Sequence, residues 1–177
     1  AIVFCLDESK SMKKFDRWKL QTREITRAID QLSNKTQFGV VFYGDGAHSF
    51  KPSLVLATDS YKAAANAYIE GRNLSLGTCM GKGVVKSLEM LRATDKKIST
   101  VIVAGDGAPT DCPYVRGKPR MSPEELESLL NRTIIANPGR KVTVHTIYAS
   151  GNTDESAVGF LKALARAHRG TYRKVGG

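Results

Sequence analysis

The chain has 177 residues and a mass of 19.3 kDa, which is about the size of one domain, and 41% of its residues are hydrophobic. It has no apolar run long enough to cross a membrane and nothing that resembles a signal peptide, so we expect one globular domain over residues 1–177. Lys and Arg number 27 against 17 Asp and Glu, and the resulting formal net charge of +10 favours acidic partners.

Four runs rich in β-branched and aromatic residues predict strands, at residues 2–6, 38–43, 99–104 and 142–148. They are mostly apolar on both faces, which is typical of central strands in a parallel sheet. Between and after them, helical patterns cover residues 15–32, 59–69, 81–91, 123–136 and 154–168. Residue 1 already stands at the edge of a predicted buried strand, so we expect the natural protein to extend upstream.

The first of these helices shows a regular apolar stripe. Trp18, Ile25, Ile29 and Leu32 recur at helical spacing, so this face is expected to pack on the sheet while the lysines and arginines stay exposed. Farther along, Ser122 is the expected N-cap of the helix over 123–136, because proline and two acidic residues follow it.

Two short elements are predicted to complete the sheet. The stretch "YGDGAHSFKPSLVL" indicates a turn into one antiparallel edge strand, where Pro52 is tolerated, and residues 170–175 form a last strand on the other side. The prediction is therefore an α/β fold: a doubly wound, mostly parallel six-stranded sheet with one antiparallel edge strand and helices on both faces.

Oxygen-bearing side chains follow two of these strands. In "IVFCLDESKSM" the first strand ends in Asp7, Ser9 and Ser11, and "STVIVAGDGAPTD" ends in Asp106. If the two strands are neighbours, both aspartates lie at the same carboxyl edge, and each needs a cation or hydrogen bonds to stay ionised. Carboxylates and hydroxyls suit Mg²⁺, Mn²⁺ or Ca²⁺ better than zinc.

The D-x-S-x-S pattern alone fits a helix cap equally well. The three histidines, His48, His145 and His168, are dispersed and are interpreted as structural residues. A third loop, "SLGTCMGKGVV", places Thr78 between glycines just before a helix, and this conjunction favours a metal site over a cap.

At this point the sequence resembles the von Willebrand factor A domain family, in which bacterial members look most similar. The resemblance covers the whole chain and implies a complete metal-ion-dependent adhesion site, which this family builds from a D-x-S-x-S loop, a threonine and an aspartate. The matching residues are Asp7, Ser9, Ser11, Thr78 and Asp106. It also implies that a bound Mg²⁺, Mn²⁺ or Ca²⁺ takes its last ligand from an acidic side chain of a protein partner.

Small departures from the family pattern fall beside the site. Cys79 stands where many relatives have asparagine, and Gly105 replaces a frequent threonine or serine. Cys79 and Cys112 both fall on loops near the metal face; free thiols are the expected state, with a disulfide as the alternative. Asp111 is either a residue that orients the metal loop or a simple turn carboxylate.

The functional hypothesis is a noncatalytic, cation-dependent protein-interaction domain, monomeric and part of a larger protein. A Mg²⁺-dependent phosphotransferase or hydrolase is an alternative, but the second acid of an aspartyl phosphatase is replaced by Ser9, and "GTCMGKG" is too short for a phosphate loop. A basic-surface nucleic-acid-binding module is the other alternative, supported by charge alone. The compartment is left open, with an extracytoplasmic or membrane-anchored parent protein favoured.

Overall fold

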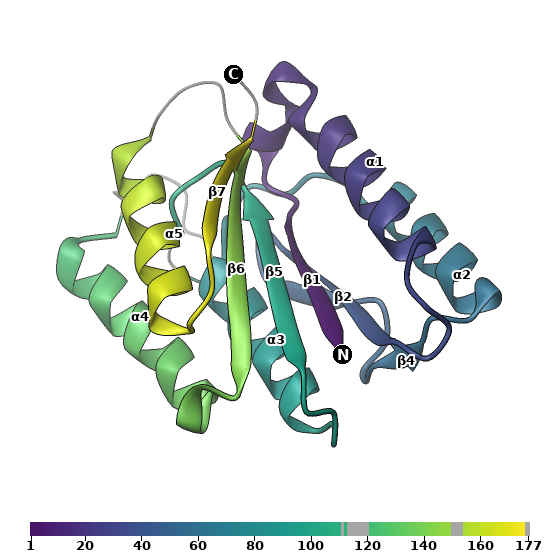
Figure 1. Ribbon diagram of the computed structural model, residues 1–177. Coiled ribbons are helices and arrows are strands. Elements are labelled where there is room, and N and C mark those ends of the chain that lie inside the picture. Colours follow the sequence, from purple (N-terminus) through teal and green to yellow (C-terminus); the bar gives the residue numbers. More distant parts are fainter. Residues whose placement is uncertain (111, 113–120, 150–153, 176–177) are drawn as a thin grey trace.

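The computed structural model describes residues 1–110, 112, 121–149 and 154–175, and it contains one central sheet flanked by helices (Figure 1). The strands run in the order β3-β2-β1-β5-β6-β7, and β4 also pairs with β2. Their bounds are Ile2–Asp7 for β1, Gln37–Tyr43 for β2, Ala47–Ser49 for β3, Val55–Leu56 for β4, Ser99–Gly105 for β5, Val142–Ala149 for β6 and Tyr172–Val175 for β7. The pairs formed among β1, β2, β5, β6 and β7 are parallel, so the predicted fold class is confirmed.

The antiparallel edge differs from the prediction in one respect. It consists of two short strands, β3 and β4, which pair with opposite halves of β2, so the described part of the sheet has seven strands and not six. The interruption falls at residues 50–54, which include Pro52. Because proline has no backbone N–H to donate, it favours a break in the ladder at this point.

Helices cover both faces of the sheet (Figure 1). They are α1 Arg17–Asp30, α2 Asp59–Glu70, α3 Met80–Arg92, α4 Pro123–Ala136 and α5 Glu155–Ala167, with short 3₁₀ segments η1 at Lys10–Asp16 and η2 at Pro138–Arg140. One apolar cluster joins the sheet to α3, α4 and α5, and a second joins it to α1 and α2. Within the described residues, no helix is long and apolar enough to cross a bilayer.

Alternation along β1 explains how one strand serves both clusters. Val3 and Cys5 belong to the cluster under α3, while Phe4 and Leu6 belong to the cluster under α1. Successive side chains of a strand point to opposite faces, so an apolar run with no polar interruption requires cover on both sides. The free Cys5 is buried, as predicted.

The first helix begins later than its apolar pattern suggested. Lys14 is extended, and Phe15 and Asp16 have positive φ angles of 56° and 52°, so α1 begins at Arg17. The predicted stripe is nevertheless correct, since Ile25 and Ile29 are buried. The N-terminus of α4 is also as predicted: Ser122 and Glu125 form a capping box.

A buried histidine ties the carboxyl end of α5 to α4 and η2. His168 has no exposed surface; its Nδ1 lies 2.8 Å from Asn137 Nδ2 and its Nε2 lies 2.9 Å from Thr133 Oγ1. Because the Asn137 amide is a donor, Nδ1 accepts and Nε2 carries the proton, which assigns a neutral imidazole. Burial lowers the pKa of His168 to about 4, and nearby Arg140 adds to this effect. The prediction of a structural histidine is confirmed.

This arrangement predicts an acid-dependent loss of stability. In the unfolded chain His168 binds a proton near its ordinary pKa of 6.5, while in the folded chain it stays neutral down to about pH 4. The free energy of unfolding should therefore fall by roughly 2 kcal/mol between pH 6.5 and 4 from this group. Urea unfolding of the wild type and of His168→Gln across this range isolates the effect. A difference between the two proteins that stays constant with pH would contradict it.

Candidate metal centre

The parallel register of β1 and β5 brings the two predicted carboxylates to one edge of the sheet. Leu6 pairs with Ala104, so Asp7 and Asp106 leave neighbouring strands at the same end. A chain of hydrogen bonds then links them. Ser9 N donates to Asp7 Oδ1 at 2.7 Å, the Ser9 and Ser11 hydroxyls lie 2.9 Å apart, and Ser11 Oγ donates to Asp106 Oδ1 at 2.7 Å. Four of the five predicted site residues thus meet at one place.

Asp7 is a buried carboxylate whose hydrogen bonds are incomplete. Its side chain is fully buried, and within the described residues its Oδ2 has no hydrogen-bond partner. Burial raises the pKa of Asp7 to about 7, and the negative charge of Asp106 contributes, while hydrogen bonding from Ser9 opposes the shift. A buried carboxylate oxygen without a partner carries a large desolvation cost, which a cation at this point would relieve.

Gly105 fits this crowded edge. A Cβ at position 105 would stand 2.7 Å from Asp7 Oδ2 and would also collide with the Tyr43 hydroxyl. That hydroxyl donates to the Ala104 carbonyl at 2.9 Å and fills the space. The Tyr43 hydroxyl therefore occupies the space that a serine or threonine side chain would need at position 105. The sequence did not reveal this contact.

Arg17 supplies a positive charge at the site, and the sequence did not predict it. Its guanidinium pairs with Asp106 Oδ2, and the arginine is buried, so the expectation that the arginines of this helix are exposed is wrong for Arg17. The late start of α1 makes Arg17 its first residue and directs the side chain inward. Its Nε is also buried without a partner in the described part of the chain. A signal was present in the sequence, since Arg17 lies at four-residue spacing from Gln21, Ile25 and Ile29, the other buried residues of α1.

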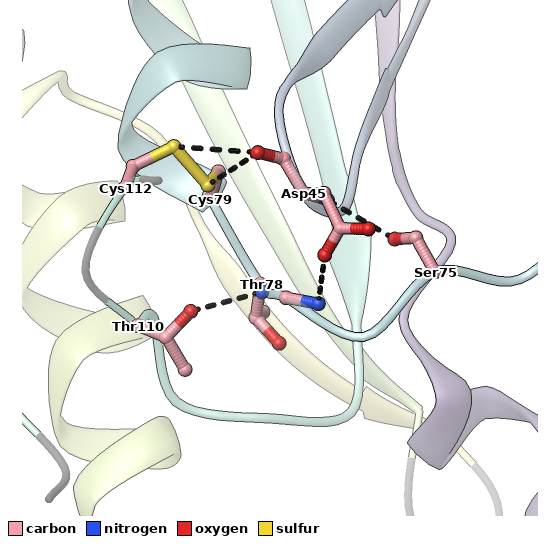
Figure 2. The surroundings of a disulfide bond; sticks show 7 residues. Asp45, Ser75, Thr78, Cys79, Thr110 and Cys112 are labelled. Carbon is pink, nitrogen blue, oxygen red and sulfur yellow. Dashed lines mark hydrogen bonds between the residues drawn. A yellow bond between two sulfur atoms is a disulfide. The ribbon is translucent and has the colours of Figure 1, made fainter. Parts of the chain in front are cut away.

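Thr78 lies in a loop that contacts both of the other loops, and Figure 2 shows the contact with the loop after β5, through Thr110. On one side, the bridge between Ser9 and Ser75 anchors the start of this loop to the D-x-S-x-S segment. On the other, Thr78 N donates to Thr110 Oγ1 at 2.9 Å, and Thr110 N donates to the Thr78 carbonyl at 3.0 Å. Among the residues that the structure describes, no hydrogen bond joins the Thr78 hydroxyl to Asp7, Ser9, Ser11 or Asp106.

The expectation of two free thiols beside the site is wrong. Cys79 and Cys112 form a disulfide, with their Cα atoms 5.4 Å apart, which links the Thr78 loop to the loop after β5 (Figure 2). Asp45, predicted only as a turn residue, reinforces this loop by accepting a hydrogen bond from Gly77 N at 2.6 Å. The pairing could not be read from the sequence because it depends on how the two loops approach each other.

A second buried ion pair supports the same region. Glu8 is almost fully buried, and both of its carboxylate oxygens accept hydrogen bonds from Arg72 at 2.8 Å. This pair ties the segment before Ser75 to the end of β1. Asp111, the candidate orienting residue, lies outside the described residues.

The donor set fits a hard divalent cation. Two carboxylates carry most of the negative charge, hydroxyls supply neutral oxygens, and one buried carboxylate oxygen has no partner. In the described part of the chain, no group of three or more histidine, cysteine, aspartate or glutamate side chains could hold a metal ion. A cation at this edge would therefore need oxygen ligands besides the two carboxylates, and the hydroxyls of Ser9 and Ser11 lie beside them.

The fold and this edge define a class of protein: an open α/β domain whose oxygen-rich loops gather at the carboxyl ends of parallel strands. The chain belongs to the von Willebrand factor type A domain family, whose profile matches residues 1–169.

Similar proteins come from animals and bacteria. The chain is 25% identical to the human inter-alpha-trypsin inhibitor heavy chain H4, in an alignment covering 98% of this chain and 18% of the relative. A von Willebrand factor type A structure from Catenulispora acidiphila aligns with a TM-score of 0.82 at 22% identity, covering 99% of this chain and 38% of that one. The pilus adhesin SpaC from Lactobacillus rhamnosus GG aligns at 0.76 and 17%, covering 99% and 28%. The chain thus spans less than a fifth of the length of the human relative.

The mussel byssus protein PTMP1 is also similar in fold, with a TM-score of 0.65 and 19% identity over 98% of this chain and 40% of that one. Its structure is described as having a zinc-occupied metal-ion-dependent adhesion site. At this level of identity the likeness concerns the fold.

The disulfide gives a direct prediction. Replacing both cysteines, as Cys79→Ser with Cys112→Ser, should lower the free energy of unfolding by about 2 to 4 kcal/mol, because the crosslink spans 33 residues. Urea unfolding measures this loss, and a reductant should affect the wild type but not the double variant. Thiol titration of the denatured, nonreduced protein provides the control. One reactive thiol, from Cys5, is expected, and three would contradict the crosslink.

Proposed function

We propose that this domain binds a protein partner through a divalent cation. Asp7, Ser9, Ser11, Thr78 and Asp106 would hold Mg²⁺, Mn²⁺ or Ca²⁺, and an acidic side chain of the partner would complete the coordination. When bound, the metal supplies a Lewis-acidic position that accepts this carboxylate. The observation that carries the proposal is the buried, unpartnered Oδ2 of Asp7 in a hydrogen-bonded chain that ends at Asp106.

The chain's own residues have distinct tasks in this proposal. Ser11 holds Asp106 in place through a hydrogen bond of 2.7 Å. Thr110, Asp45 and the disulfide fix the backbone of the Thr78 loop, so that little conformational freedom is lost when its hydroxyl becomes a ligand. A fixed loop also limits the range of ion sizes that the site accepts.

A noncatalytic role is the better-supported alternative. An aspartyl nucleophile must reach its substrate, whereas the side chains of Asp7 and Asp106 are both fully buried. No observation specifically favours a phosphotransferase, a hydrolase or a nucleic-acid-binding module. The α5 helix buries Leu161 and Leu164 in the core, as an ordinary core helix does.

The parent protein is proposed to be larger than this domain and to be extracytoplasmic or membrane-anchored, with the domain itself monomeric. A disulfide beside the site supports an oxidising compartment. The fold is shared with a pilus adhesin, and the similar heavy chain H4 is several times longer than this chain, which agrees with a domain of a larger protein.

The ligand set is tested by metal titration. Asp7→Asn and Thr78→Ala should each weaken Mn²⁺ binding by roughly 10- to 100-fold or more, because each removes a ligand oxygen or its charge. Isothermal titration calorimetry measures the affinity, and Mg²⁺, Ca²⁺ and Zn²⁺ establish the preference. Thr143→Ala, which removes a half-buried threonine hydroxyl near the opposite end of the sheet, is the matched control. Unchanged affinity in both site variants would refute the assignment.

Asp7→Asn carries an internal check on folding. The substitution removes a buried charge whose second oxygen has no partner, so the metal-free variant should unfold at the same temperature as the wild type or higher. A variant that is stable but no longer stabilised by Mn²⁺ separates lost metal binding from lost structure. Differential scanning calorimetry with Mn²⁺ and with EDTA distinguishes the two.

Arg17 provides an independent prediction. Because its guanidinium already pairs with Asp106, it opposes the approach of a second cation. Arg17→Met should tighten Mn²⁺ binding by about tenfold. Arg23→Met removes an exposed arginine of the same helix and should leave the affinity nearly unchanged. Equal affinity in wild type and Arg17→Met would show that the guanidinium does not compete with the metal.

A further inference from the structure

A groove of about 810 Å³ opens beside the candidate metal loops. One wall comes from η1 and the start of α1, and the other from residues 72–74. The lining residues that matter here are Lys10, Lys13, Trp18, Lys19, Arg72 and Leu74. None of the five proposed metal ligands lines it, so the groove is a separate surface.

Both walls continue directly into the metal loops. Lys10 stands in the sequence between the candidate ligands Ser9 and Ser11, and its backbone N donates to the Ser75 carbonyl at 2.8 Å. Ser75 follows Leu74 of the opposite wall and forms a bridge with Ser9. The two walls are therefore joined at their site end, and the groove leads away from the place where a partner's carboxylate would bind.

The groove carries an excess of positive charge. Arg72 is neutralised by the buried Glu8, and Lys19 lies 3.4 Å from Asp16, which also lines the groove and is its one acidic lining residue among those described. Lys10 and Lys13 are exposed, and neither has a carboxylate within salt-bridge distance in the described part of the chain. Trp18 and Leu74 are half-buried and add apolar surface between these charges. A basic groove with an aromatic side chain suits an extended acidic segment better than a neutral one.

We infer that this groove, defined by Lys10, Lys13, Trp18 and Leu74, binds acidic side chains that flank the metal-bound acid in an extended segment of the protein partner. The inference rests on the proposed function, since the metal fixes the first carboxylate. In an extended chain, side chains at alternate positions point the same way and lie about 7 Å apart. Acids at alternate positions would follow the groove away from the metal, and Lys10 and Lys13 would select for them.

The test uses two synthetic peptides in a glycine-serine background. One contains a single aspartate, and the other contains the same aspartate with glutamates at alternate positions on both sides. Trp18 is the chain's single tryptophan, so its fluorescence reports occupation of the groove directly. With Mn²⁺ present, the multi-acid peptide should bind about fivefold more tightly than the single-acid peptide, and it alone should shift the Trp18 emission.

Two double variants test whether Lys10 and Lys13 cause the difference in affinity between the peptides. Lys10→Gln with Lys13→Gln should reduce the affinity ratio of the two peptides to about one, since two exposed ion pairs account for it. Lys96→Gln with Lys97→Gln removes the same charge from exposed lysines before β5, at the other end of the sheet, and should leave the ratio unchanged. If the affinity ratio is unchanged in the first double variant, or falls equally in the second, the proposal that the groove binds the flanking acids is wrong.

The outcomes also separate this inference from the proposed function. If the single-acid peptide binds only with Mn²⁺ but the two peptides bind equally, the result supports metal-dependent binding of an acidic side chain and refutes the binding of flanking acids in the groove. If the multi-acid peptide binds equally with Mn²⁺ and with EDTA, metal capture is refuted, and with it the inference as stated. If a heparin oligosaccharide shifts the Trp18 emission while neither peptide does, the groove recognises a sulfated glycan, and the acidic-segment inference is wrong.

Discussion

The structure depends on placing two carboxylates at the same buried edge of a parallel sheet. The register of β1 against β5 fixes Asp7 and Asp106 as neighbours, and neither side chain reaches solvent. Burial is the main reason that the pKa of Asp7 rises to about 7, and the nearby negative charge of Asp106 adds to this shift.

The chain compensates only in part. Ser11 and Arg17 satisfy the two oxygens of Asp106, and Ser9 N satisfies one oxygen of Asp7. The other oxygen of Asp7 has no partner among the described residues. Because a protein core normally pairs its buried polar atoms, these side chains are better suited to binding a cation than to forming an ordinary core. Under the proposed function, the Thr78 loop would favour a metal ion and the Arg17 guanidinium, which already pairs with Asp106, would compete with it.

Much of the fold could be predicted because it depends on local patterns. Apolar strands, the stripe containing Ile25 and Ile29, and the Ser122 cap each carry their own signal. Four of the five candidate ligands lie together because parallel strands end at one edge, and hydrogen bonds join those four, while the role of Thr78 as a ligand stays a prediction. The division of the antiparallel edge, the inward turn of Arg17, the Cys79–Cys112 disulfide and the role of Tyr43 were not predicted. The edge, the disulfide and the Tyr43 contact depend on segments far apart in the sequence, whereas Arg17 shares the four-residue spacing of the buried Ile25 and Ile29 and could have been predicted.

The most direct measurement of the central claim is paramagnetic NMR with Mn²⁺. A ¹⁵N-labelled domain is titrated with substoichiometric Mn²⁺, and the amide signals that broaden first identify the residues nearest the ion. We predict that the amides of Ser9, Ser11, Thr78 and Asp106 broaden together at the lowest Mn²⁺ concentration, and that Mg²⁺ reverses the effect. Broadening that begins elsewhere, or that is spread evenly over acidic surface residues such as Glu24 and Glu70, would contradict a metal centre at this edge of the sheet.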